Sequence, residues 1–239
     1  MFLRFHLNLV TSALAAICAF VTPAAAAAAA AEKTGLVDVS VELGAATEYV
    51  SKGVGKSMGE PHVYGSVTAS HGPAYIKVYA TPVELSRGSD SEILTTVGVQ
   101  PKAAGLEFDV KAIYRLRPGT DAGVDSTYWE VEADVTKKAG PVSTRLRVNY
   151  TPDGFAGTKE AWWVEGQATW KVAAKTKVSA ALGRREATGG QDYTAYSIGV
   201  RQGLTKNLEA DLRWYGTNHA DDLRGEYRPG LVGSLNLKF

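Results

Sequence analysis

From Val37 onward, apolar and polar residues alternate along the chain with a period of two. The final segment is the clearest case, since one of its faces consists of Leu231, Gly233, Leu235, Leu237 and Phe239. Successive side chains of a β-strand point to opposite faces, so this alternation predicts strands with one apolar side and one polar side. We find no segment of more than two turns with the spacing of an amphipathic helix.

About twelve segments carry the alternation. They cover residues 37–45, 63–69, 74–80, 93–99, 106–114, 129–135, 142–150, 164–172, 178–182, 196–200, 208–214 and 231–239. Long and short gaps alternate between them, the long ones at 51–61, 81–91, 117–127, 151–161, 185–192 and 216–229. Long loops on one rim and short periplasmic turns on the other are typical of outer-membrane barrels. The predicted fold is therefore all-β, a single antiparallel transmembrane up-and-down β-barrel of about 12 strands.

Periodicity alone also allows a soluble barrel, in which the apolar face points inward. Gly65 and Gly166 on the apolar face leave too little side-chain volume to fill such a core, which favours lipid outside. Aromatic residues gather near the predicted strand ends, where interfacial girdles lie. They are Tyr49, Tyr79, Tyr114, Tyr128, Trp129, Tyr150, Trp162, Trp163, Trp170, Tyr193, Trp214 and Tyr215. In addition, Leu235, Leu237 and Phe239 resemble the C-terminal signal that barrels present to their assembly machinery.

The N-terminus predicts export. Residues 1–26 contain Arg4 and His6, a short apolar run and A-x-A sites, which together indicate a cleaved signal peptide. Residues 27–35 are predicted to be a disordered leader and residues 36–239 the barrel. A lipoprotein anchor at Cys18 is the alternative, although Ile17 is bulky where a small residue is expected.

Processing at this site changes the available chemistry. Cys18 is the only cysteine, so the mature chain would have no disulfide and no thiol nucleophile. Loss of Arg4 leaves 25 of the 26 basic residues against 25 acidic ones. A neutral balance argues against nucleic acid as a partner.

If the apolar faces meet lipid, the polar faces line the lumen. The candidate lumen and constriction residues are Glu107, Asp109, Lys111, Arg115, Glu130, Glu132, Asp134, Arg145, Arg147, Glu165, Lys171, Glu209, Asp211 and Arg213. The acidic strip from Glu130 to Asp134 is predicted to face Arg145 and Arg147 on the next strand. We hypothesise that the two strips create a transverse field, with a loop folded inward to narrow the lumen. The open alternative is that these pairs only hold the wall together.

Catalysis is not predicted. A barrel hydrolase needs a serine and a histidine within hydrogen-bond distance. Ser70 and His71 are adjacent and would point to opposite faces, while His62 and His219 lie in or beside predicted loops with no suitable serine. No pattern of phosphate-binding glycines or metal ligands is present, so no cofactor is expected.

The first hairpin carries a specific motif. The run Thr47-Glu48-Tyr49-Val50-Ser51-Lys52-Gly53-Val54-Gly55-Lys56-Ser57, followed by Glu60-Pro61, resembles the opening of the TorF-like porin family. Its loop residues include Tyr49, Lys52, Gly53 and Pro61. Weaker similarities follow at Phe108-Asp109-Val110, at Tyr150-Thr151-Pro152-Asp153 and at Ser197-Ile198-Gly199-Val200. The resemblance implies an outer-membrane barrel, although Lys52 replaces the usual arginine and does not reproduce its forked geometry.

Together these features predict a porin of a Gram-negative outer membrane that gives small hydrophilic solutes or ions passive passage through a charge-lined lumen. The expected partners are membrane lipid, the assembly machinery and the solutes themselves. The alternative is a structural or adhesive barrel whose lumen is plugged by its own salt bridges. The sequence leaves the solute, the ion selectivity and the oligomeric state open.

Overall fold

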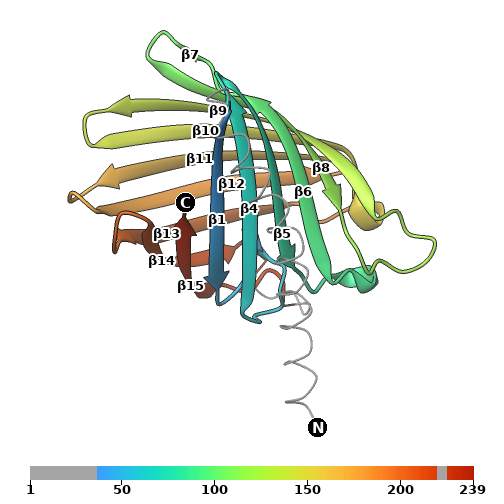
Figure 1. The fold of residues 1–239 in the computed structure, drawn as a ribbon. Coiled ribbons are helices and arrows are strands. Elements are labelled where there is room, and N and C mark those ends of the chain that lie inside the picture. Colours follow the sequence, from blue (N-terminus) through green and yellow to red (C-terminus); the bar gives the residue numbers. More distant parts are fainter. Residues whose placement is uncertain (1–36, 220–224) are drawn as a thin grey trace.

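The computed structural model describes residues 37–219 and 225–239. The predicted signal peptide (1–26) and leader (27–35) lie outside the described residues. Twelve long antiparallel strands form a barrel (Figure 1). They are β1 (Asp38–Ala46), β4 (His62–His71), β5 (Ala74–Pro82), β6 (Ser91–Val99), β8 (Leu106–Leu116), β9 (Thr127–Ala139), β10 (Val142–Gly154), β11 (Lys159–Lys171), β12 (Thr176–Ala187), β13 (Tyr193–Gly203), β14 (Leu208–Thr217) and β15 (Gly230–Lys238).

The barrel is closed and has up-and-down topology. Each long strand pairs with the long strand that follows it in sequence, including β6 with β8, and the first strand, β1, pairs with the last, β15. The closing register places Glu42 opposite Lys238 and Ala46 opposite Ser234. Closure removes the exposed sheet edges, which a membrane does not tolerate because lipid offers no hydrogen-bond partners. The predicted fold class is therefore confirmed.

Three shorter strands and two 3-10 turns complete the described chain. The strands β2 (Val50–Ser51) and β3 (Val54–Gly55) pair only with each other, within the first long loop. The strand β7 (Lys102–Ala103) extends the turn before β8, and the turns η1 (Ser86–Gly88) and η2 (Phe155–Gly157) lie in long loops. Within residues 37–219 and 225–239, no helix has the length and apolar character needed to cross a membrane.

Several strands extend further towards the long-loop rim than the alternation predicted. The gap predicted at 151–161 shrinks to 155–158, because β10 continues to Gly154 and β11 begins at Lys159. Similarly, β12 reaches Ala187, beyond the predicted end at Leu182. A ladder needs only backbone partners, so strands persist where the side-chain alternation has lapsed.

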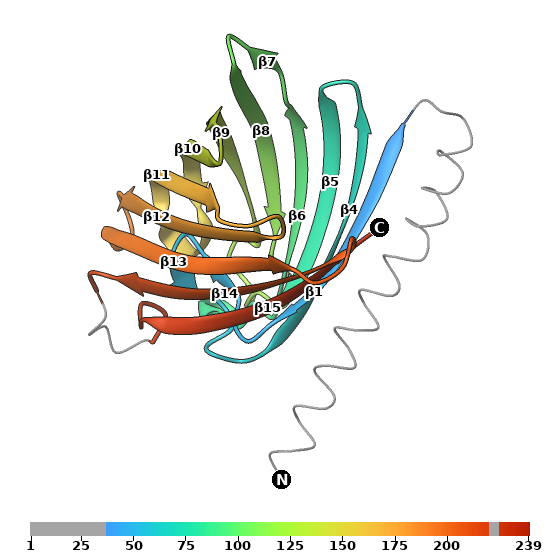
Figure 2. The same cartoon turned by 90° about the vertical axis from the view of Figure 1, so that its left-hand side faces the viewer.

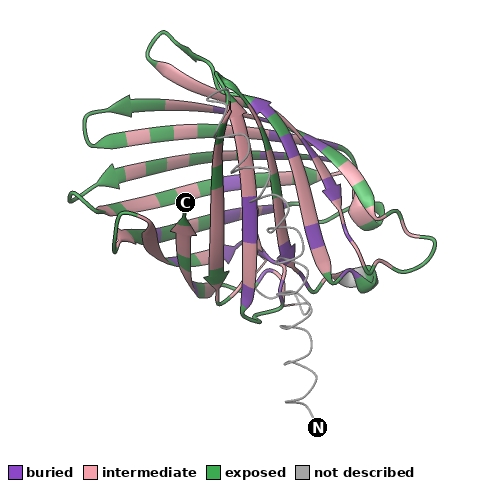
Figure 3. Ribbon diagram, in the orientation of Figure 1, coloured by how far each residue is buried: buried purple, intermediate pink, exposed green. Residues whose placement is uncertain are grey.

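The two faces of the wall have opposite chemistry. Residues of different burial alternate along many of the strands (Figure 3). Side chains buried inside the barrel are largely polar or charged, among them Glu92, Arg115, Glu130, Glu132, Asp134, Asn149 and Arg213. Large apolar side chains are exposed on the outside, among them Val97, Val131, Leu146, Leu182, Ile198, Leu212 and Leu231. A soluble protein would have the reverse arrangement. The described barrel therefore has the predicted orientation, with the apolar faces outward.

The aromatic girdle prediction is partly wrong. Trp129, Trp162, Trp170 and Trp214 are exposed on the outer face, and the pairs Tyr114–Trp129 and Tyr150–Trp162 lie 4.8 and 4.5 Å apart between ring centroids. By contrast, five aromatic residues of the same predicted set have their side chains inside the barrel: Tyr49, Tyr79, Tyr128, Trp163 and Tyr193. Adjacent residues of one strand point to opposite faces, so Trp162 and Trp163 cannot both face lipid.

Candidate functional site

The first long loop folds into the barrel as a hairpin, formed by β2 and β3 (Figure 2). Lys52 and Gly53 form its two-residue turn, with φ values of 52° and 78°. Positive φ at both central residues is the type I′ arrangement, whose twist suits a tight hairpin. The Lys-Gly pair of the opening motif therefore has a structural role, as the turn that carries the hairpin to its tip.

The hairpin tip is tied to three strands. The Lys52 ammonium lies 2.8 Å from Glu130 on β9 and 2.6 Å from the amide oxygen of Asn149 on β10. The Lys52 carbonyl accepts a hydrogen bond of 2.9 Å from the hydroxyl of Tyr193 on β13. Burial lowers the pKa of Lys52, whereas Glu130 opposes that shift and favours the charged form. The hairpin thus spans the lumen from β1 towards the opposite wall.

A small apolar cluster seats the tip. Val54 packs among Trp163, Tyr193, Ala195 and Tyr227, and all five side chains are buried. A Cβ atom at Gly53 would overlap the Cβ of Ala195, so the close approach requires glycine here.

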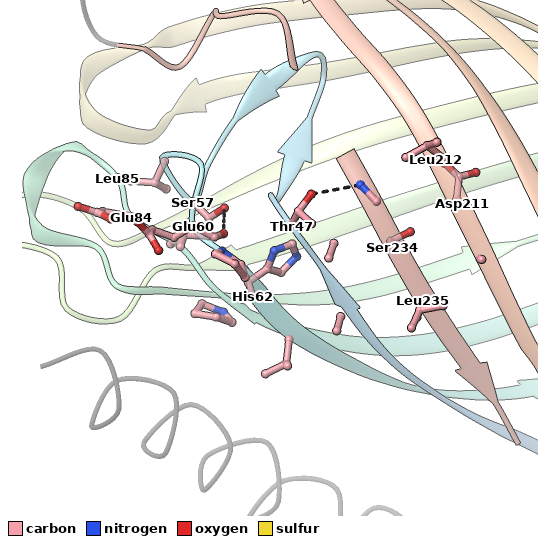
Figure 4. Close-up of a pocket in the computed structure, with 18 of the residues that line it drawn as sticks. Thr47, Ser57, Glu60, His62, Glu84, Leu85, Asp211, Leu212, Ser234 and Leu235 are labelled. Atoms are coloured by element: carbon pink, nitrogen blue, oxygen red, sulfur yellow. Dashed lines mark hydrogen bonds between the residues drawn. The ribbon is translucent and has the colours of Figure 1, made fainter. Parts of the chain in front are cut away.

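The base of the hairpin is held at the rim. The backbone N–H of Tyr49 donates to the Ser57 hydroxyl, at 3.0 Å, and that hydroxyl donates to the Glu60 carbonyl at 2.8 Å (Figure 4). Across the β1–β15 seam, the backbone N–H of Gly233 donates to the Thr47 hydroxyl at 3.1 Å. Both ends of the loop are therefore fixed, as is its tip.

Behind the hairpin lies a buried ion-pair cluster centred on Glu92 of β6, whose side chain is fully buried. Its carboxylate lies 2.9 Å from both Arg115 and Arg117 and accepts a 2.8 Å hydrogen bond from the Tyr49 hydroxyl. Arg115 continues the chain of contacts to Glu130, at 3.0 Å. The hairpin lysine, two wall arginines and two wall carboxylates therefore form one connected network.

A second cluster follows on the same wall. Lys111 lies 2.8, 3.0 and 2.9 Å from Asp109, Glu132 and Asp134. Arg147 contacts the last two carboxylates at 3.1 and 2.7 Å. Oppositely charged residues on β8, β9 and β10 are therefore paired with one another along the wall.

The remaining candidate residues form smaller groups. Arg145 pairs chiefly with Glu165 at 2.5 Å and is 4.0 Å from Asp134. On the far wall, Asp211 lies 3.2 Å from both Arg213 and Arg201. Towards the short-turn rim, partly exposed pairs join Glu107 to Lys138 and Glu209 to Lys238, and Lys171 is exposed. The acidic strip and the two arginines thus occupy one wall, and the transverse field stays a hypothesis about conduction.

Sequence reasoning missed important members of this site. Glu92 and Arg117 fall at the edges of gaps predicted to be loops, yet both are buried in the network. Asn149 lies in the predicted strand 142–150 but is not among the candidate lumen residues, and its side chain bridges Lys52, Glu130 and Glu132. Extending the period-two face of β8 by one step, from Arg115 to Arg117, would have placed this arginine inside.

A cavity of about 510 Å³ lies beside the hairpin, and we call it the outer vestibule. It is bordered by Lys52, Lys56, Arg115, Arg117, Arg185 and Glu130, together with the loops that follow β10 and β14. Its volume is in the range of small-molecule sites. It lies towards the long-loop rim, where residues of the loops after β10, β12 and β14 border it.

A separate groove lies on the outer face (Figure 4). Its lining includes Ala45, Val63, Leu212 and Leu235, and the two leucines are about half exposed on the outside of the wall. The groove therefore belongs to the apolar surface and not to the lumen. Among the residues that the structure describes, no group of three or more acidic, histidine or cysteine side chains has the arrangement of a metal site.

A closed barrel of twelve strands with a charged interior and an inward hairpin has the fold of an outer-membrane porin. Two solved structures share this fold. A KdgM porin aligns with a TM-score of 0.53 at 9% identity, and the alignment covers 84% of this chain and 98% of that one. A KdgM porin in complex with disordered oligogalacturonate gives 0.56 at 7% identity, with the same coverage of both chains.

The profile of a bacterial protein family of unknown function, Gcw_chp, matches residues 30–231, and the chain belongs to that family. No curated protein matches the sequence. Since the family description assigns no activity, the resemblance to TorF-like proteins stays a prediction. The identities to solved structures are low, so these likenesses establish the fold alone.

Proposed function

We propose that this protein is a porin of a Gram-negative outer membrane, exported with a cleaved signal peptide, that gives small hydrophilic solutes or ions passive passage. The observation that carries the proposal is the inside-out wall: buried charges face the lumen, and large apolar residues are exposed outside. The charged inner face favours contact with water and ions, and the apolar outer face favours contact with lipid. The proposed role includes no catalytic step.

The hairpin is proposed to set the width of the path. A barrel of about eight strands is filled by its own side chains and one of sixteen or more holds an open channel, so twelve strands give an intermediate lumen. A folded-in loop narrows such a lumen further. The contacts of Lys52 with Glu130 and Asn149 support a fixed constriction, because a charge-assisted hydrogen bond adds about 1.5–3 kcal/mol.

The second candidate is a barrel that does not conduct. It is favoured by the same network, since Lys52, Arg115 and Glu130 join the hairpin to the wall without a break. In that case the ion pairs would hold the hairpin as a plug in the lumen, and the long loops would contact partners outside the cell.

Liposome swelling separates the two candidates. Proteoliposomes that contain the folded protein are transferred into isotonic solutions of neutral sugars of increasing size. A porin allows swelling with the smallest sugars and a sharp loss of rate as size increases. Absence of swelling at every size, with the barrel shown to be folded, would favour the plugged barrel.

The proposed partners during assembly are lipid and the barrel-assembly machinery. Leu235, Leu237 and Phe239 lie on or directly after β15, and Phe239 is 65% exposed. An exposed terminal aromatic is available to a receptor, which supports its proposed use as an assembly signal. Replacing Phe239 with alanine should lower the amount of folded barrel in the outer membrane, as measured by membrane fractionation.

A further inference from the structure

The outer vestibule carries more positive than negative side chains. Among the described residues that border it, the cations are Lys52, Lys56, Arg115, Arg117 and Arg185, and the carboxylates are Glu130 and Glu226. Three of the cations have acidic partners, because Lys52 and Arg115 contact Glu130 and Arg117 contacts Glu92. The other two do not.

Lys56 is the first unpaired cation. In the described part of the chain, no carboxylate lies within ion-pair distance of its ammonium. Arg117, Arg115 and Lys52 all act on it as like charges, and Glu92 opposes them. A lysine in this position is short of negative charge, and a bound anion would supply it.

Arg185 is the second. Its guanidinium donates a 2.6 Å hydrogen bond to the Gln191 carbonyl and lies 5.8 Å from the ring centroid of Tyr193. These contacts fix the side chain against the vestibule wall without neutralising it. Arg117 borders the same cavity and adds positive charge to it, while its guanidinium is held by Glu92 and by the Tyr128 hydroxyl.

Positive charges that no carboxylate neutralises, gathered around one cavity, favour a ligand that is negatively charged and rich in hydrogen-bond acceptors. We propose that the outer vestibule binds small anions that carry carboxylate or phosphate groups, with Lys56, Arg117 and Arg185 as the binding residues. The inference rests on the proposed function in one respect: the anion would be a solute on its way through the barrel. Anion binding itself depends only on the charges that line the vestibule, and not on transport.

Isothermal titration calorimetry on the folded protein in detergent tests the site without relying on transport. The probes are citrate, inorganic phosphate and, as a neutral control, sucrose. Wild-type protein should bind at least one of the two anions and should not bind sucrose. Binding of citrate alone would assign the site to carboxylates, and binding of phosphate alone would assign it to phosphate groups.

The variants are K56M and, as the matched control, K102M. Lys102 lies in the short turn at the other rim, and its side chain is 75% exposed. Loss of one charge-assisted contact should weaken anion binding roughly tenfold or more in K56M. The control should bind like wild type. Equal weakening in both variants, or no anion binding by wild-type protein, would overturn the proposal.

Calorimetry and liposome swelling test the two proposals independently. Anion binding without sugar uptake would support the vestibule site and contradict the porin proposal. Sugar uptake without anion binding would support the porin proposal and contradict the vestibule site.

Discussion

At the residue scale, the stability of the barrel depends on carboxylates that are buried among other side chains inside the wall. Glu92 is fully buried between two arginines, and only 4% of the Glu130 side chain is exposed, against Arg115 and Lys52. Such groups are stable only while every charge has its partner. Truncating one partner leaves the other buried and unpaired. Breaking a buried pair therefore lowers the free energy of unfolding more than breaking a surface pair does.

Glu92→Gln should therefore destabilise the barrel strongly. The change leaves Arg115 and Arg117 buried with one neutral acceptor in place of a carboxylate, and breaking a buried pair costs about 3–5 kcal/mol. Glu209→Gln is the control, since its pair with Lys238 is partly exposed and contributes about 0–1 kcal/mol. Urea unfolding in lipid vesicles, followed by tryptophan fluorescence, gives both values. Equal losses in the two variants would contradict this account of the network.

Lys56 should make ion selectivity depend on pH. Burial, together with the nearby Arg117, lowers the pKa of Lys56 to about 7. A lysine is charged below its pKa and neutral above it, so anion preference should increase from about pH 8 to about pH 6. The other charges that act on it are Glu92, Arg115 and Lys52.

The measurement is the reversal potential in a KCl gradient, because neither ion titrates in this range. The shift with pH should disappear in Lys56→Met. A shift of the same size in that variant would assign the effect to another group.

At the element scale, the strands and the presence of an inward-folded loop were predictable, but which loop folds inward and which wall it meets were not. A period of two is a local property, so each long strand was identified from its own residues. The hairpin is held by contacts across 78, 97 and 141 residues of sequence, from Lys52 to Glu130, Asn149 and Tyr193. A motif marked the turn, but nothing in the loop itself indicated which wall it would meet.

The facing errors have a similar origin. Tyr193 lies near a strand end and was assigned to the girdle on that basis. Its position relative to Tyr196 and Ile198, which are exposed on the outside, places it on the inward face. Parity along the strand therefore predicts facing better than closeness to the strand end.

Gly53→Ala should lift the hairpin tip. The new Cβ would overlap Ala195, and φ at this position is 78°. Gly59→Ala is the matched control, because φ there is 83° and no atom lies within 4 Å of the added Cβ. Single-channel conductance should increase in the first variant and stay near wild type in the second, and Ala195→Gly should partly reverse the effect. Equal behaviour of the two alanine variants would show that backbone strain, and not the contact, matters.

At the scale of the whole molecule, the barrel is an alternating wall closed on itself. The alternation along twelve strands determined the fold class and the outward apolar face, and both were predictable. The path through the lumen was not, because its width depends on how one loop sits inside the closed wall. The central claim is that this loop narrows a water-filled lumen.

The most direct test replaces Val50–Gly55 with Asn-Gly. The backbone N–H of Lys56 donates to the carbonyl of Tyr49 at 2.7 Å, so a two-residue turn can join these residues. Planar-bilayer recordings of both proteins then compare single-channel conductance, with folding checked by the gel shift on heating. We predict small, uniform steps for wild type and clearly larger steps for the replacement variant. Equal conductance in the two folded proteins, or no conductance in either, would contradict the claim.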